Sequence, residues 1–209
     1  MTKLTNTAFT AEKNLYAVFG AKDITLTWNE NYGEVPAKTT TIQTYSETEK
    51  VVTQTAPTRA GYNFLGWYSQ ATGGKLIENG KVALPTDNAE YFAHWSAATI
   101  TLNWDADGGE PSKQVTSPTF SPDTKVTEPS TEPTKAGYDF KGWFTDKSYK
   151  TEAKDTNIPT SETTYYAKWD PATIKFKWYD EDKTTELVAG GTQQEYSPTG
   201  NVLFPTDPT

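Results

Sequence analysis

The stretch "AGYNFLGWY" at Ala60–Tyr68 returns as "AGYDFKGWF" at Ala136–Phe144, 76 positions further along the chain. Both copies begin with a Gly-Tyr pair and continue with an aromatic residue, a second glycine and a tryptophan, without helical spacing. A glycine inside a strand often marks a β-bulge, which shifts the alternation of side chains by one position. We therefore expect both aromatic residues around the second glycine to face one core. These pairs are Phe64 with Trp67 and Phe140 with Trp143.

Two further motifs recur in register with the first. An opening strand of alternating apolar residues ends at Trp28, and this pattern returns at Trp104 and Trp178. A closing strand with the pattern Tyr-x-Ala-x-Trp ends at Trp95 and again at Trp169. Alternation with a period of two is typical of half-buried antiparallel strands, so these tryptophans are expected to face inward.

Prolines and glycines separate the predicted strands. A Pro-Thr-basic turn precedes Gly61 and Gly137, and both glycines are expected to take positive φ. Threonine is frequent and suits the solvent face of a sheet, whereas no credible amphipathic helix of about ten residues is present. The sequence therefore predicts an all-β fold of small modules with little or no helix.

The repeats divide the chain into four parts. Residues 22–97 and 98–171 each contain all three motifs and form two complete modules. Residues 1–21 are expected to be the end of an upstream repeat, and residues 172–209 the beginning of a third repeat that stops before its Gly-Tyr motif. Because only four residues link successive modules, we expect an elongated, semi-rigid rod cut from a longer protein.

Composition limits the possible functions. The 209 residues are 34% hydrophobic and 13% aromatic, so large rings must supply much of the buried area. No cysteine is present, which excludes disulfides and zinc-thiolate sites. The net charge of −8 disfavours nucleic acid as a partner, because phosphate backbones are negative. No apolar stretch approaches the roughly 20 residues of a membrane helix, so membrane insertion is not expected.

With these residues in view, the chain resembles the Listeria–Bacteroides repeat, also called the internalin B-type B repeat. The resemblance rests on "WDADGG" at 104–109, "EPTKAGYDFKGWF" at 132–144 and "TYYAKW" at 164–169, with counterparts in the first module. It implies a β-grasp-like module in tandem within a large, extracellular, cell-wall-attached adhesin-like protein of Gram-positive type. The third opening, "IKFKWYDEDKTTE" at 174–186, is more similar to mucin-binding-protein-like repeats.

Four aromatic side chains are not assigned to the core by the alternation and are expected on the outer faces of the strands. Exposed rings there could stack on carbohydrate. These candidate ligand-binding residues are Tyr68, Phe92, Phe144 and Tyr166. The repeated tryptophans could also form such a platform, but their positions favour the core. The single histidine, His94, has no counterpart in the other closing strands, so a solvated strand residue is the favoured interpretation.

Acidic residues offer two weaker candidates. Asp105 and Asp107 could bind Ca²⁺, but the first module has Asn29 and Asn31 there, and "DADGG" is a good turn sequence. The acidic run at 180–182 could supply the carboxylate pair of a glycosidase, but its members are adjacent in an expected turn. We therefore expect no metal, no cofactor and no catalytic residue.

The favoured function is a non-catalytic stalk or spacer in a cell-surface protein, with weak adhesive contacts. The alternative is a module that binds carbohydrate or a host glycoprotein, and the weakest is part of an extracellular enzyme whose catalytic domain lies elsewhere. Neighbouring repeats are the expected partners. The incomplete repeats at 1–21 and 172–209 could also pair head to tail between molecules through their unpaired strands.

Overall fold

The computed structural model describes residues 16, 20–179, 183–184 and 191–204. Strands make up its regular structure, and the one helical element described is a 3₁₀ turn of three residues, η1 (Ala153–Asp155). The predicted all-β class is therefore confirmed. Among the described residues, no helix has the length and apolar character needed to cross a bilayer.

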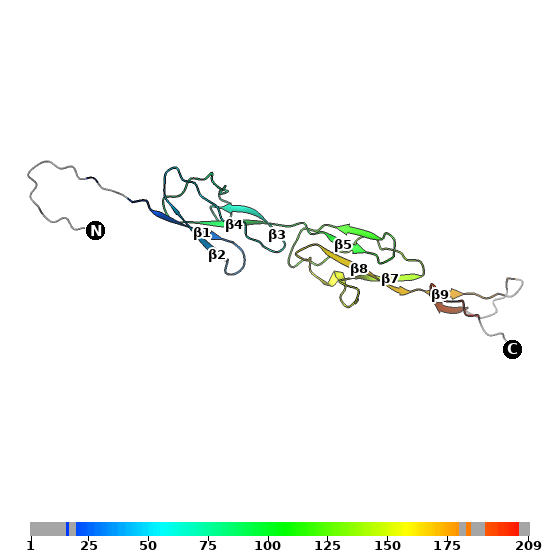
Figure 1. The fold of residues 1–209 in the computed structure, drawn as a ribbon. Coiled ribbons are helices and arrows are strands. Elements are labelled where there is room, and N and C mark those ends of the chain that lie inside the picture. The colour runs from blue at the N-terminus through cyan, green and yellow to red at the C-terminus, as the bar shows by residue number, and fades with distance from the viewer. Residues whose placement is uncertain (1–15, 17–19, 180–182, 185–190, 205–209) are drawn as a thin grey trace, which may run out of the picture. The chain divides into compact units, whose positions relative to one another are not determined.

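The chain divides into two compact units (Figure 1). The first unit contains residues 1–57 and 65–94, and the second contains residues 58–64 and 95–209. Residues 58–64 thus pack in the second unit although the sequence motifs assign them to the first repeat. The module boundaries given by the repeats remain a sequence prediction.

The first four strands form one sheet of mixed direction. They are β1 (Asp23–Asn29), β2 (Lys38–Thr44), β3 (Tyr62–Tyr68) and β4 (Ala89–Ala97), in the order β2-β1-β4-β3. The opening strand β1 pairs antiparallel with β2, as expected, but parallel with β4. Parallel neighbours need a long connection between them, and the segment that contains β2 and β3 supplies it.

The next four strands repeat this sheet. They are β5 (Leu102–Asp105), β6 (Lys113–Thr116), β7 (Tyr138–Phe144) and β8 (Thr163–Pro171), in the order β6-β5-β8-β7. The central pair, β5 and β8, is again parallel, and the β5–β6 and β7–β8 pairs are antiparallel. The same order of strands therefore follows from the same order of motifs.

Tryptophans form the centre of each core, as the alternation predicts. In the first unit Trp28 is fully buried and packs edge-on against Trp67, with ring centroids 5.1 Å apart. In the second unit Trp104 is fully buried between Trp143 at 5.3 Å and Tyr165 at 4.8 Å. Edge-to-face and stacked aromatic contacts of this kind stabilise a small core beyond the area that they bury.

Each opening-strand tryptophan also satisfies its buried indole N–H in the same way. Trp28 donates to the Thr41 hydroxyl, Trp104 to Thr116 and Trp178 to Thr192, each at 2.9 Å. A buried donor without a partner would cost about 1–3 kcal/mol. A threonine on the second strand of each repeat therefore serves the core as a hydrogen-bond acceptor.

The glycines of the motif take the expected conformations. Gly61 and Gly137 have φ of 78° and 80°, and Gly142 has φ of 113° at a register shift between β7 and β8. The predicted bulge is thus present in the second repeat. Trp67 and Trp143 are buried, whereas Phe64 and Phe140 are only half-buried beside Trp95 and Trp169. Those two closing-strand tryptophans are themselves half-buried rather than fully inward.

The segment expected to open a third repeat contains a pair of strands among the described residues. β9 (Thr173–Phe176) and β10 (Thr192–Glu195) form a two-stranded antiparallel sheet. Ile174, Phe176 and Trp178 alternate as in the other repeats but are only half-buried. The closing strand expected within residues 1–21 lies almost entirely outside the described residues.

Candidate functional site

The outer face of the second sheet carries an open hollow of about 450 Å³. It forms because Asn103 and Asp105 point away from the core, next to Thr164 and Tyr166 of the parallel neighbour β8. Polar side chains and one ring thus meet on one surface. The hollow is lined by Asn103, Trp104, Asp105, Lys113, Gln114, Val115, Thr164 and Tyr166.

A lysine lies over the ring in this hollow. Lys147 Nζ lies 5.3 Å from the centroid of the Tyr166 ring and 2.7 Å from Oδ1 of Asp107. The acidic turn therefore holds this cation near the aromatic surface. A ring with hydrogen-bonding groups and a cation beside it can contact a sugar or another polar ring.

The first unit has a different arrangement at the equivalent place. Glu90 stands where the second unit has Thr164, and its carboxylate accepts from Lys38 at 2.7 Å and from the Asn29 amide at 2.8 Å. These hydrogen bonds, from Lys38 and then Asn29, hold the pKa of Glu90 below its ordinary value. A charged pair thus stands in the first unit where the second unit has Thr164 beside the hollow.

The four predicted ligand-binding residues are divided between the two units. Tyr68 and Phe92 belong to the first unit, and Phe144 and Tyr166 belong to the second. Tyr166 lines the hollow, while Phe92 and Tyr68 are half-buried.

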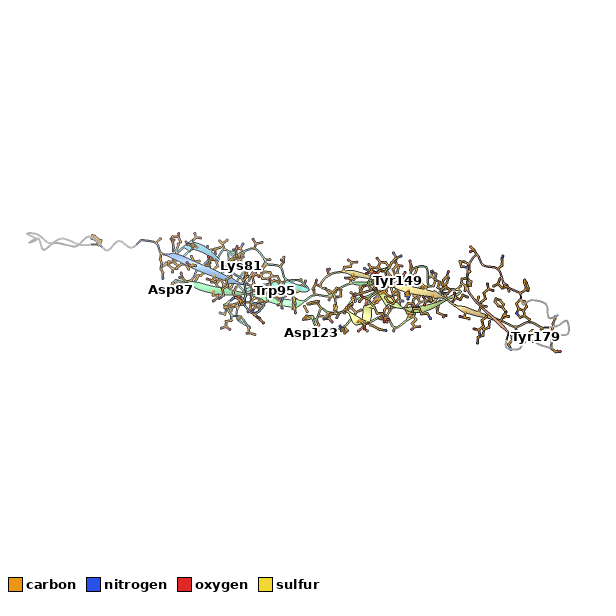
Figure 2. All side chains as sticks on the ribbon, turned by 90° about the horizontal axis from the view of Figure 1, so that it is seen from below. Lys81, Asp87, Trp95, Asp123, Tyr149 and Tyr179 are labelled. Carbon is orange, nitrogen blue, oxygen red and sulfur yellow. The ribbon has the colours of Figure 1, made fainter. Side chains whose placement is uncertain are left out.

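The expectation that Phe144 faces solvent is wrong. Phe144 pairs with Tyr166 on the outer side of the sheet, but it is only 7% exposed. The Tyr149 ring packs edge-on against it at 5.7 Å, from the loop after β7; Figure 2 shows Tyr149 among the side chains of the second unit. A bridge between Phe144 and Glu152 brings this loop onto the strand.

His94 is more constrained than a solvated strand residue. Its ring stacks on Tyr68 with centroids 3.9 Å apart and an angle of 7°. Nε2 donates to the carbonyl oxygen of Gln70 at 2.9 Å. Both interactions fix the imidazole as part of the local packing, which also occupies one face of Tyr68.

The Asp105–Asp107 segment is a turn. The Asp107 N–H donates to Oδ1 of Asp105 at 2.9 Å, and Asp107 has φ of 48°. Asn29 and Asn31 repeat this geometry, with 2.8 Å and φ of 55°. Asp and Asn tolerate this backbone conformation, so the turn explains the residues at both places. Among the described residues, no group of three or more His, Asp or Glu side chains could hold a metal ion.

Asp107 is tied to the loop that follows β7. The hydrogen bond from Lys147 holds the pKa of the Asp107 carboxyl below its ordinary value. The charges of Lys147 and Lys135 also lower this pKa, whereas partial burial raises it. Lys135 Nζ also donates to the Asp107 carbonyl oxygen at 3.0 Å. The turn thus joins three segments of the second unit.

Replacing Asp107 with asparagine should remove the charge but keep the turn, because the first repeat already has Asn31 there. We expect a loss of at most about 1 kcal/mol at pH 7, as for other exposed ion pairs. A lowered pKa stabilises the folded state above the unfolded value of about 3.9. The difference from the parent should therefore disappear as the pH falls through the lowered folded pKa, measured by urea unfolding. A difference that persists at acid pH would contradict the ion-pair explanation.

Sequence reasoning missed the contributions of Lys147, Thr164 and Tyr149 to this face. Nothing in their local sequence signals a role, because each acts through a contact with a segment distant in the chain. The acidic candidates Asp180, Glu181 and Asp182 lie outside the described residues.

The chain belongs to the Listeria-Bacteroides repeat domain family, whose model matches residues 25–94 and 101–168. These two matches cover most of the two four-stranded sheets. The resemblance inferred from the motifs is therefore confirmed.

Similar proteins are much longer than this chain. Internalin H of Listeria monocytogenes serovar 1/2a is 30% identical over 138 residues, which is 65% of this chain and 24% of that protein. A protein of Evansella cellulosilytica that carries the name of a Gly-rich membrane protein is 33% identical over 118 residues, 54% of this chain and 13% of that protein. The chain thus spans about a quarter or less of the relatives that it matches.

Proposed function

We propose that this chain is a non-catalytic spacer segment of an extracellular, cell-wall-attached bacterial surface protein. The observation that carries the proposal is the burial of Trp28, Trp67, Trp104 and Trp143, which uses the repeated motif for folding. The family and the similarity to Internalin H support a surface location. The mechanism is geometric: successive repeats hold another domain of the full protein at a distance.

Short links between the repeats support this proposal. Four residues, "SAAT" at 96–99, separate Trp95 from Ile100, and "DPAT" at 170–173 separates Trp169 from Ile174. Such short links limit free rotation of neighbouring modules, and a proline stiffens the second link further. A spacer needs this kind of restriction, because a flexible chain would collapse to a shorter distance.

Small-angle scattering of the purified chain tests the spacer directly. A compact protein of this length would have a radius of gyration of about 17 Å. We expect a clearly larger value with a high axial ratio, at all concentrations measured. A value near that of a compact globule would exclude the spacer function, whereas a rise with concentration would indicate the head-to-tail pairing of terminal repeats.

A second candidate, binding of a carbohydrate or host glycoprotein, is favoured by one observation, the hollow beside Tyr166. The Tyr166 ring offers a stacking surface, and Asn103 and Asp105 offer hydrogen-bonding groups. A glycan array decides between the two candidates. Binding that is lost in Tyr166→Ala but kept in Phe92→Ala would establish a site in the second unit. No binding by the parent chain would leave the spacer as the function.

A further inference from the structure

The Gly-Tyr pair that opens each aromatic motif receives a ring from a later part of the chain. The Phe120 ring occupies the space beside Gly61, so that an added Cβ there would lie under 3.0 Å from the ring carbons. Tyr62 packs edge-on against the same ring, with centroids 5.4 Å apart at 79°. All three residues belong to the second compact unit.

Two backbone hydrogen bonds fix this contact. The Ala98 N–H donates to the Gly61 carbonyl oxygen at 2.9 Å, and the Phe120 N–H donates to the Ala98 carbonyl oxygen at 2.7 Å. Ala98 lies in the link between repeats and is bonded to both sides. The ring is therefore positioned by the backbone as well as by its own packing.

The same arrangement occurs a second time at Gly137. The Tyr196 ring occupies the space where a Cβ of Gly137 would stand, and it packs edge-on against Tyr138 at 5.3 Å and 75°. The Ala172 N–H donates to the Gly137 carbonyl oxygen at 2.9 Å, and the Tyr196 N–H donates to the Ala172 carbonyl oxygen at 2.8 Å. The second arrangement thus has the same hydrogen bonds and the same ring geometry as the first. Its four residues are Gly137, Tyr138, Ala172 and Tyr196.

A cation covers each tyrosine. The Arg59 guanidinium carbon lies 3.7 Å from the centroid of the Tyr62 ring, and Lys135 Nζ lies 4.9 Å from that of Tyr138. Each Gly-Tyr pair therefore presents a cation-covered tyrosine beside an open glycine backbone. Such a surface suits the electron-rich face or the edge of one more aromatic ring.

General core packing does not account for both cases. Phe120 is a member of the buried core of the second unit, but Tyr196 is half-buried and follows a sheet that has two strands among the described residues. The contact at Gly137 therefore forms although the Tyr196 side chain is only half-buried. Its recurrence indicates a specific contact between the motif of one repeat and the second strand of the next.

We propose that the Gly-Tyr pair is a docking site whose ligand is an aromatic ring supplied by the following repeat of the same family. The ring-bearing residue stands four positions after the threonine that accepts the indole hydrogen bond, as Phe120 follows Thr116 and Tyr196 follows Thr192. This docking links consecutive repeats through a defined contact, and so it specifies how the proposed spacer is joined.

Tyr45 is the corresponding ring of the first repeat. It stands four positions after Thr41, and its N–H donates to the Lys22 carbonyl oxygen at 2.7 Å, as Phe120 does to Ala98. Residues 1–21 contain no Gly-Tyr pair. The proposal therefore predicts that Tyr45 can dock on the Gly-Tyr pair of another copy of the repeat.

Hydrogen exchange on the whole chain tests the docking site. Gly137→Ala should exclude the Tyr196 ring and raise exchange at the amides of Ala172 and Tyr196 at least tenfold. Gly80→Ala is the matched control, because Gly80 has φ of 69° but open space where its Cβ would stand. It carries the backbone penalty without displacing a ring, and both amides should keep their protection.

Tyr196→Ala removes the ring and leaves the glycine in place. It should raise exchange at the Ala172 amide without changing strand β5, whereas Tyr45→Ala should leave the Ala172 amide unaffected. If Gly137→Ala unfolds the whole second unit, Tyr196→Ala decides the question. Unchanged protection of Ala172 in Tyr196→Ala, or equal effects of Gly137→Ala and Gly80→Ala on these amides, would overturn the proposal even if the spacer function holds.

Discussion

Replacing Trp104 with alanine should lower the free energy of unfolding of the second unit by about 3–5 kcal/mol. Trp104 is fully buried, it contacts the rings of Trp143 and Tyr165, and its indole donates to Thr116. The substitution would leave a large cavity and an unpaired hydroxyl at the centre of a small core. Because a domain has only about 5–15 kcal/mol of stability, this unit would be close to unfolding.

Urea unfolding followed by the remaining tryptophan fluorescence measures this loss. Trp178→Ala is a matched control, since Trp178 has the same place in the third repeat and the same bond to threonine but is only half-buried. It should cost much less than Trp104→Ala. Equal and small effects of the two substitutions would mean that the motif tryptophans do not support the fold.

The second large effect is expected at Gly142, which lies at the β-bulge, and at Gly66, its counterpart in the first repeat. Gly66→Ala and Gly142→Ala should each cost about 1–3 kcal/mol, because φ of 133° and 113° lies outside the conformations that side-chain-bearing residues adopt readily. The two sites differ in space: a Cβ on Gly66 meets Leu76 Cδ1 at 2.5 Å, whereas a Cβ on Gly142 meets nothing closer than 3.8 Å. Leu76 is exposed and its end can rotate, so the extra cost at Gly66 should be small.

Thermal and urea unfolding of both variants check this prediction. Gly73→Ala serves as the control, because Gly73 has φ of 68° and open surroundings, and it should cost less than either bulge substitution. A bulge variant as stable as the parent would show that the glycine is not required by the backbone there.

The sequence alone predicted the parts of the fold that repeat along the chain. Alternation placed Ile100, Leu102 and Trp104 in the core, and the paired glycines predicted the bulge at Gly142. These features depend on neighbours within a few positions. The parallel pairing of β5 with β8 was not predicted, because alternation gives the buried face of a strand but not its neighbour.

The candidate site was less accessible to prediction for a similar reason. Tyr166 lines a hollow, but Phe144 is covered because the loop that follows it folds back and places Tyr149 on its ring. Whether a strand position stays open depends on such loops. The difference between Glu90 and Thr164 at equivalent positions can be interpreted only when Lys38 and Asn29 are known to lie beside Glu90.

The central claim is that the repeated tryptophans are interior packing elements and not a displayed binding surface. Fluorine NMR of the chain labelled with 5-fluorotryptophan tests it most directly, because all seven tryptophans report separately once single substitutions assign them. The resonances of Trp28, Trp67, Trp104 and Trp143 should resist broadening by a soluble paramagnetic agent, while that of Trp178 broadens. Broadening of Trp67 and Trp143 as strong as that of Trp178 would contradict the claim.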